Sequence, residues 1–303
     1  MDLGFIGFGA MGHPMAEHLL HAGHGLSVWS RRPESAAALV AQGAHWCDSP
    51  AAVAGASEIV CTNVTGSADV EALAGELAEG FAPGGIHLDF STIAPSAARR
   101  IAASYAALGV DFVDAPVSGG SAGARAATLA IMWGGKLALA PRLQTIFASL
   151  GKTVVHVGET GAGQVAKACN QMVMVAAIEA AAEAARLAAA SGIDFVRVRR
   201  AMLGGSAGSR VLEVFGERMA TRNFMSPAAA PGTVSPKGTP IVEARLHHKD
   251  YALLMDEATR IGAALPVSAT VWQQLNALMA QGRGRQDTSA LLRVLETGAG
   301  SAR

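Results

Sequence analysis

The chain has 303 residues, of which 50% are hydrophobic and 16% are charged, so it can form one large domain or two ordinary ones around a substantial core. Lysine plus arginine and aspartate plus glutamate both total 24, and this balance argues against binding to nucleic acid or to an anionic membrane surface. The three cysteines, Cys47, Cys61 and Cys169, form no Cys-x-x-Cys pair, which argues against a disulfide framework and predicts a reducing, cytoplasmic setting.

Short apolar segments typical of buried strands recur through the first half of the chain, separated by helix-like sequence. They lie at residues 2–7, 26–29, 59–62, 86–89, 110–113 and 154–157. Such alternation predicts βαβ units and a parallel sheet. Because strand-like sequence already begins at Asp2, we expect no secretory signal peptide.

The alternation stops near Gly158, and helix follows helix from Gly163 onward. The expected helices lie at residues 163–190, 194–204, 207–221, 243–262, 267–281 and 287–297. We therefore predict two domains, residues 1–162 and residues 163–303. The segment from Ser226 to Pro240 has four prolines and two glycines, and we interpret it as a flexible surface insertion.

The stretch from Met172 to Ala190 is apolar enough to suggest a membrane span at first sight. It contains Glu179, Glu183 and Arg186 at spacings that share one helix face, whereas a spanning helix needs about 20 residues almost free of charge. We interpret this stretch as a long buried helix of a soluble protein that is not associated with a membrane.

A glycine-rich loop, Gly7-Phe8-Gly9-Ala10-Met11-Gly12, follows the first strand and opens a helical run. This is the context that the dinucleotide-binding fingerprint requires. Gly7 permits a tight turn, Gly9 lets the backbone approach a pyrophosphate near helix N–H groups, and Gly12 allows close packing of helix on strand. The loop and the alternating strands predict an α/β fold, with an N-terminal Rossmann-type parallel sheet domain followed by an all-α C-terminal domain.

The second strand ends in Trp29-Ser30-Arg31-Arg32. An NAD-selective site usually places an acidic residue here to bind the ribose 2′-hydroxyl. Ser30 is neutral, and Arg31 and Arg32 can bind a 2′-phosphate. The sequence therefore favours NADP(H), with NAD(H) as the alternative if one arginine only stacks on adenine.

Two further segments supply candidate chemistry. Ser118-Gly119-Gly120 offers a hydroxyl and freely oriented backbone N–H groups that suit a small carboxylate, although such a turn is also common without function. Lys167 and Asn170 are three residues apart, so they share a helix face. The neighbours of Lys167 are apolar, and burial would lower the pKa of a lysine towards a range useful for proton transfer.

His247-His248-Lys249-Asp250 resembles a metal cluster only superficially. Adjacent histidines point to different faces of a helix, and no His-Glu-x-x-His motif accompanies them. We therefore predict no metal site.

Five motifs occur in a fixed order along the chain. They are Gly-Phe-Ile-Gly-Phe-Gly-Ala-Met-Gly at 4–12, Asp89-Phe-Ser-Thr92-Ile-Ala-Pro, Asp114-Ala-Pro-Val-Ser-Gly-Gly, Gly163-Gln-Val-Ala-Lys167-Ala-Cys-Asn170-Gln, and Lys249-Asp250. With these motifs the chain resembles the β-hydroxyacid dehydrogenase (3-hydroxyisobutyrate dehydrogenase) family over nearly its whole length. The stretches Leu203-Gly-Gly-Ser-Ala-Gly-Ser-Arg and Leu246-His-His-Lys-Asp are most similar to the branch whose members reduce tartronate semialdehyde.

The resemblance implies a role for each motif. Lys167 would be catalytic, Ser118, Gly119, Gly120 and Asn170 would hold the substrate, and Thr92 and Lys249 would contact the nicotinamide half of the cofactor. We also assign Val64, just after the strand at 59–62, to the cofactor site. The resemblance further implies a small aldehyde or hydroxy acid as substrate and a homodimer or homotetramer built through the helical domain.

Three alternatives stay open at this point. Another dehydrogenase of the family, acting on 3-hydroxyisobutyrate, succinic semialdehyde or glyoxylate, would share the turn and the lysine. An imine reductase usually has another residue at position 167, and a non-catalytic NADPH-binding protein would not need Lys167, Asn170 and Ser118 together. Two features depart from close relatives: the 226–240 insertion and the neutral Ser30, where relatives can have an acid.

Overall fold

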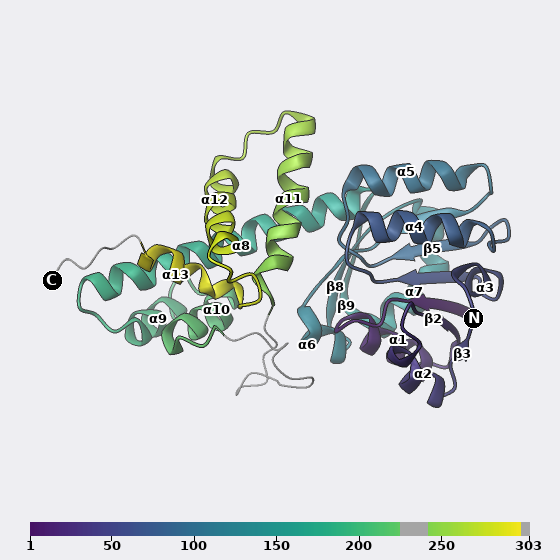
Figure 1. Ribbon diagram of the computed structural model, residues 1–303, viewed down its shortest axis with the longest axis horizontal. Coiled ribbons are helices and arrows are strands. Elements are labelled where there is room, and N and C mark those ends of the chain that lie inside the picture. The colour runs from purple at the N-terminus through teal and green to yellow at the C-terminus, as the bar shows by residue number, and fades with distance from the viewer. Residues whose placement is uncertain (225–241, 298–303) are drawn as a thin grey trace. The chain divides into compact units, whose positions relative to one another are not determined.

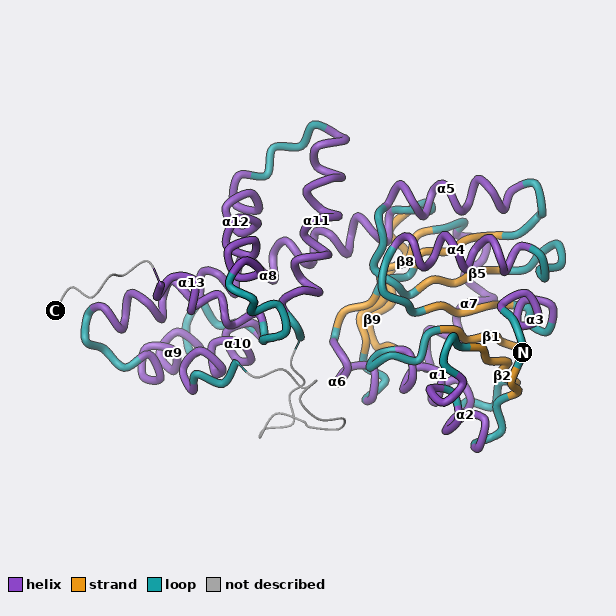
Figure 2. The backbone as a smooth tube through the Cα atoms, viewed as in Figure 1, coloured by secondary structure: helices purple, strands orange, loops and turns teal. Residues whose placement is uncertain are grey.

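The computed structural model describes residues 1–224 and 242–297, and the predicted insertion at 226–240 lies outside these described residues. The chain divides into two compact units, Met1–Lys167 and Ala168–Arg303. The first is a sheet flanked by helices, and the described part of the second consists of helices and their connecting loops (Figure 2). The predicted fold class, a Rossmann-type sheet domain followed by a helical domain, is confirmed.

Most of the sheet is parallel and doubly wound. Its parallel strands lie side by side in the order β3 (His45–Trp46), β2 (Gly25–Trp29), β1 (Asp2–Ile6), β4 (Ile59–Thr62), β5 (Ile86–Asp89) and β6 (Asp111–Asp114). In the register, Phe5 of β1 faces Val28 of β2 on one side and Cys61 of β4 on the other. The strand order therefore reverses at β1, and sheets of this kind bind ligands beyond the carboxyl ends of the strands at such a switch point.

The other edge of the sheet is mixed, which the sequence did not predict. It consists of β7 (Val117–Ser118), β8 (Leu129–Gly134) and β9 (Gly151–Gly158). β8 runs antiparallel to β6 and β7, and β9 runs parallel to β8. The expected strand at 154–157 lies in β9, but β8 was missed. The helix before β8, α6 (Gly120–Arg125), has only six residues, roughly 9 Å, which is too short for the crossover that a parallel neighbour needs.

Helices cover both faces of the sheet (Figure 1). α1 (Gly12–His21), α2 (Ala37–Ala41), α6 and α7 (Ala140–Leu150) contribute to the core on one face, and α3 (Pro50–Gly55), α4 (Ser67–Ala78) and α5 (Pro95–Ala106) pack on the other. Side chains alternate along each strand, so Phe5 and Ile6 enter different cores. Short 3-10 helices precede α2 and α7, at Pro33–Ser35 and Leu137–Leu139.

The second unit is built around the long helix α8 (Ala162–Ala190), which begins in the first unit. The helices that follow are α9 (Phe195–Leu203), α10 (Arg210–Thr221), α11 (Ala244–Ile261), α12 (Pro266–Ala280), a 3-10 helix (Thr288–Ala290) and α13 (Leu291–Thr297). Their core includes Ile178 of α8, Tyr251 of α11 and Leu275 of α12. No described helix is long and apolar enough to cross a membrane.

Candidate functional site

The glycine loop makes a tight turn between β1 and α1. Gly7 has a φ of +106°, which favours glycine, and a Cβ atom there would lie 2.2 Å from the carbonyl oxygen of Asn63. A Cβ atom on Gly12 would lie 1.9 Å from the carbonyl oxygen of Gly7 and 3.2 Å from the Phe5 ring. These contacts give physical reasons for glycine at both positions.

The middle of the loop is open. Apart from Gly9 and its two neighbours in the chain, no described residue has an atom within 4 Å of the position that a Cβ on Gly9 would take, and Gly9 and Ala10 are both exposed. Phe8 stacks on Phe5 at a ring separation of 5.8 Å, which anchors the loop to the sheet. Met11 is the residue before α1, so the glycine loop lies at the N-terminal end of this helix, where the helix dipole favours an anionic pyrophosphate. The loop therefore fits a dinucleotide.

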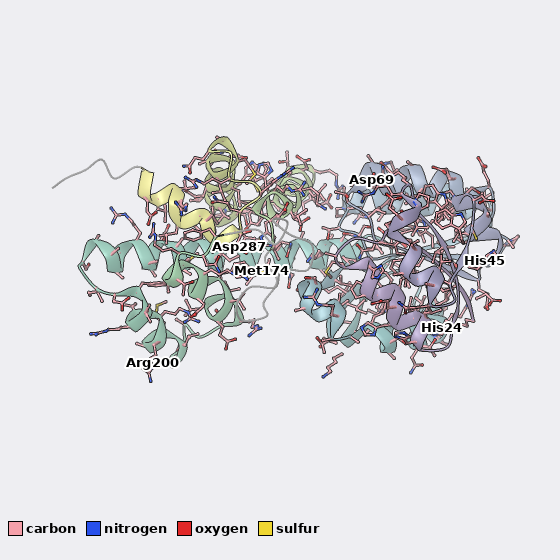
Figure 3. All side chains as sticks on the ribbon, turned by 60° about the horizontal axis from the view of Figure 1, so that its bottom comes forward. His24, His45, Asp69, Met174, Arg200 and Asp287 are labelled. Carbon is pink, nitrogen blue, oxygen red and sulfur yellow. The ribbon has the colours of Figure 1, made fainter. Side chains whose placement is uncertain are left out.

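The segment after β2 is polar and cationic. The Ser30 hydroxyl lies 2.8 Å from that of Ser35 and accepts a hydrogen bond from the Arg32 backbone N–H, which fixes the turn. The Arg31 side chain is 78% exposed and lies 3.6 Å from a carboxylate oxygen of Asp69. Asp69, which is labelled in Figure 3, lies in the first turn of α4. Asp69 is an ionic partner of Arg31 that the sequence did not suggest.

The loops after β4 and β5 are joined by one buried carboxylate. An oxygen of Asp89 accepts hydrogen bonds from the hydroxyls of Thr62 (2.7 Å) and Ser91 (2.6 Å) and from the Ser91 backbone N–H (3.1 Å). The Ser91 hydroxyl oxygen in turn accepts from the backbone N–H of Val64 at 2.9 Å. Val64 and Thr92, both predicted to contact the cofactor, thus lie on loops that are fixed to each other at the carboxyl edge of the sheet.

The predicted substrate turn has the backbone geometry that only glycine adopts easily. Ser118 ends β7, and Gly119 and Gly120 have φ angles of +136° and +60°. Gly120 is the first residue of α6. The turn thus presents one hydroxyl and successive backbone N–H groups beside the end of β7.

Lys167 lies next to this turn. Its Nζ donates a hydrogen bond to the carbonyl oxygen of Val117 at 2.9 Å, and the residue is only 7% exposed. Val117 immediately precedes Ser118 in β7, so the ammonium group is within the same small region as the turn. A buried cation beside a turn that carries a hydroxyl and backbone N–H groups can polarise a carbonyl group and donate a proton to it.

The start of α8 is held by Asp114, at the end of β6. The Asp114 carboxylate accepts hydrogen bonds from the backbone N–H groups of Gly161 (2.6 Å) and Gln164 (2.9 Å). Burial raises the pKa of Asp114 to about 7, although these two hydrogen bonds act in the opposite direction. Asp114 therefore fixes the first turn of the helix on which Lys167 lies.

Asn170 and Lys249 belong to the second unit. Asn170 donates from its side-chain amide to Gln171 at 3.0 Å, and Gln171 donates to Asp250 at 2.5 Å. Lys249 forms an ion pair with Asp250 at 3.1 Å. This polar group joins the part of α8 after Lys167 to α11, and two of its members, Asn170 and Lys249, are predicted site residues.

The histidine pair in α11 has other partners. His247 hydrogen-bonds the Thr288 hydroxyl at 2.7 Å, and His248 hydrogen-bonds Asn276 at 2.9 Å while it stacks on Trp272. Among the described residues there is no group of three or more His, Cys, Asp or Glu side chains that could hold a metal ion.

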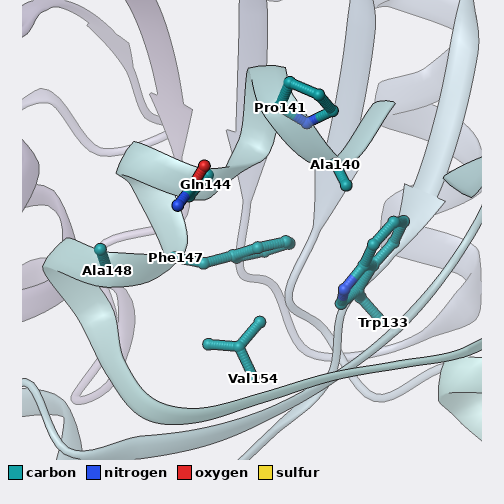
Figure 4. Close-up of a pocket in the computed structure, with 7 residues that line it drawn as sticks. All are labelled: Trp133, Ala140, Pro141, Gln144, Phe147, Ala148 and Val154. Atoms are coloured by element: carbon teal, nitrogen blue, oxygen red, sulfur yellow. The ribbon is translucent and has the colours of Figure 1, made fainter. Parts of the chain in front are cut away.

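A cavity of about 380 Å³ lies elsewhere, against α7, β8 and β9 (Figure 4). It is lined by Trp133, Ala140, Pro141, Gln144, Phe147, Ala148 and Val154. None of these seven side chains can transfer a proton near neutral pH, and none is a predicted site residue. We therefore do not place the active site in this cavity.

In the first unit, hydrogen bonds connect the segments that carry four of the predicted site residues, Val64, Thr92, Ser118 and Lys167. Two others, Asn170 and Lys249, lie in the second unit. Sequence reasoning gave no role to Asp89, Asp114 or Gln164, which make these connections. All three lie within the motifs quoted above, where each is a polar residue among apolar neighbours. That contrast was the signal in the sequence that could have identified them.

Comparison with known proteins covers nearly the whole chain. Residues 2–158 match the family described as the NAD binding domain of 6-phosphogluconate dehydrogenase. Residues 161–295 match the family described as NAD-binding of NADP-dependent 3-hydroxyisobutyrate dehydrogenase.

Individual relatives differ in the substrates that they are named for. The chain is 40% identical to the 2-hydroxy-3-oxopropionate reductase of Escherichia coli, over 98% of this chain and 97% of that one. It is 34% identical to the 2-(hydroxymethyl)glutarate dehydrogenase of Eubacterium barkeri, over 98% and 95% of the two chains. Among solved structures, 3-hydroxyisobutyrate dehydrogenase of Mycobacterium tuberculosis with L-serine matches with a TM-score of 0.86 and 28% identity, over 97% and 98% of the two chains.

Proposed function

Because the chain belongs to the 3-hydroxyisobutyrate dehydrogenase family of NAD(P)-dependent oxidoreductases, we propose that it reversibly reduces tartronate semialdehyde (2-hydroxy-3-oxopropionate) to glycerate. The observation that supports an acid–base role most directly is the buried Lys167 ammonium, 2.9 Å from the carbonyl oxygen next to Ser118. The choice of substrate is supported by 40% identity with the Escherichia coli reductase, against 34% with the glutarate enzyme.

Each residue has a part in the proposed mechanism. When bound, the nicotinamide cofactor supplies the hydride that reduces the aldehyde carbon. Ser118, Gly119 and Gly120 bind the substrate carboxylate through the hydroxyl and backbone N–H groups, with Asn170 assisting. Lys167 stabilises the negative charge that develops on the aldehyde oxygen and donates its proton to it. In the reverse direction, neutral Lys167 removes the hydroxyl proton of glycerate. Thr92 and Lys249 contact the nicotinamide half of the cofactor, and Val64 also contacts the cofactor.

The substrate assignment is tested by initial rates of the purified protein. We expect kcat/KM for tartronate semialdehyde to exceed that for succinic semialdehyde and glyoxylate by at least about tenfold, because one misplaced group in a substrate pocket costs roughly 1–3 kcal/mol. Oxidation of glycerate and 3-hydroxyisobutyrate is compared in the reverse direction. A higher kcat/KM for any rival would assign the chain to that substrate instead, and no turnover of any of them would contradict a dehydrogenase role.

The cofactor preference that we propose is for NADP(H). In Arg31→Ala/Arg32→Ala, we expect kcat/KM for NADPH to fall about 10- to 100-fold and that for NADH to change less than about threefold, since only NADPH has a ribose 2′-phosphate for the guanidinium groups to bind. The exposed Arg100, which pairs with Glu71 outside the glycine loop, serves as the control in Arg100→Ala. An equal loss with both cofactors would refute a role in 2′-phosphate recognition.

A further inference from the structure

Gln164 is a buried glutamine whose side chain binds the backbone on both sides of Thr92. It is 2% exposed. Its amide nitrogen donates to the carbonyl oxygen of Ser91 at 2.9 Å, and its amide oxygen accepts from the backbone N–H of Ile93 at 3.1 Å. The side chain therefore hydrogen-bonds to the backbone of the residue before Thr92 and of the residue after it.

The backbone of Gln164 is fixed as well. Its N–H donates to Asp114 at 2.9 Å, and Asp114 also accepts from Gly161, so the residue sits in the capped first turn of α8. Lys167 follows three residues later in the same helix and binds Val117. One residue thus connects the Thr92 loop, the end of β6 and the helix of Lys167, and all of these lie within Met1–Lys167.

Buried backbone groups need hydrogen-bond partners, and leaving one without a partner costs about 1–3 kcal/mol. An apolar side chain of similar size at position 164 would leave the Ser91 carbonyl and the Ile93 N–H without the partners that Gln164 provides. The loop would then shift towards other partners, and Thr92 would move relative to Lys167. A side chain that only filled space would not need both an acceptor and a donor at these two positions.

We propose that Gln164 is a positioning residue that sets the place of Thr92, and of the nicotinamide that it contacts, relative to the proton donor Lys167. This inference rests on the proposed function, because it assigns Thr92 and Lys167 their roles in that reaction. Hydride and proton must reach adjacent atoms of one carbonyl group, and a displacement of about 1 Å is enough to reduce the rate about 100-fold.

The test compares Gln164→Leu with the wild type and with Thr160→Val, which removes a hydrogen bond to Phe112 in the same unit. In Gln164→Leu we expect kcat to fall about 10- to 100-fold, Kd for NADPH to change less than about threefold, and the isotope effect with 4-deuterated NADPH to increase. Hydrogen exchange of a peptide spanning residues 90–97 should become faster, because Ile93 loses its acceptor. Thr160→Val should change none of these.

Gln164→Glu supplies a pH-dependent rescue. A neutral carboxylic acid has the shape of the amide and can donate to Ser91, whereas a carboxylate cannot. The rate of Gln164→Glu relative to wild type should therefore rise as the pH falls from 8 to 6, while the deficit of Gln164→Leu stays constant. Normal kcat in Gln164→Leu, or a deficit without faster exchange at residues 90–97, would overturn the positioning role. Absence of turnover in the wild type would instead refute the proposed function, and the positioning role with it.

Discussion

Replacement of Lys167 by Met is expected to reduce kcat for tartronate semialdehyde by at least about 1,000-fold and to leave binding of NADPH within about threefold of wild type. A positioned general acid contributes about 10²–10⁴-fold, and loss of a preorganised donor to a developing oxyanion costs about 3 kcal/mol. Both contributions come from one ammonium group, which is buried and directed at the Val117 carbonyl beside the substrate turn. Steady-state rates and fluorescence titration of NADPH measure the two quantities.

The control for this substitution is Lys136→Met. Lys136 is 70% exposed and pairs with Asp111 at 2.7 Å, so its loss removes a charge and a surface ion pair worth less than about 1 kcal/mol. Lys167→Arg separates charge from proton transfer, because a guanidinium keeps its proton at any working pH. We expect Lys167→Arg to stay at least about 100-fold below wild type. Near-normal turnover in Lys167→Met would contradict its assignment as the proton donor.

The parts of the site that sequence analysis predicted are those with local causes. The glycine loop was recognisable because Gly7, Gly9 and Gly12 stand at the fingerprint spacing directly between a strand-like segment and a helical run. The long helix was recognisable because alanine-rich, helix-forming sequence continues from Gln164 to Ala190 without a glycine or proline. Helix limits in the second unit were predicted within about one turn for the same reason.

The connections between these parts depend on contacts between residues that are far apart in the chain, and a single sequence does not reveal such contacts. Gln164 reaches residues 71 and 73 positions away, and Arg31 meets Asp69, which lies 38 positions away by residue number. The missed strand β8 has a related cause: its direction is set by pairing with β6 and β7 and not by its own composition. Local patterns thus identified the chemical groups, while tertiary contacts fix the spacing between them.

A second large effect concerns stability and comes from Glu179 in α8. This residue is 4% exposed, and neither of its carboxylate oxygens has a hydrogen-bond partner among residues 1–224 and 242–297. Burial, and then repulsion from Glu183, raises the pKa of Glu179 from 4.5 to about 7. The folded protein therefore holds a proton that the unfolded chain releases at lower pH.

The sign of the pH dependence follows from this difference. Below pH 4.5 the carboxyl group is neutral in the folded and in the unfolded protein, so it does not change the free energy of unfolding. Between pH 4.5 and about 7 the carboxyl group ionises only in the unfolded protein, which favours unfolding. The full loss of stability amounts to about 3 kcal/mol and is reached above pH 8. Wild-type unfolding free energy should therefore decrease with rising pH by this amount relative to a variant that lacks the group.

Glu179→Leu is the variant to compare, because Val175, Ile178 and Ala182 around it on α8 are fully buried. The free energy of unfolding in urea should rise for this variant relative to wild type, by about 3 kcal/mol between pH 4.5 and 8.5. Taking the difference between the two proteins removes the contribution of Asp114, whose raised pKa acts in the same range. The exposed Glu76 of α4, which lies in the other unit, supplies the control, and Glu76→Gln should change stability by less than about 0.5 kcal/mol. A pH-independent difference for Glu179→Leu would mean that the carboxyl group is ionised in the folded protein and has a partner that lowers its pKa.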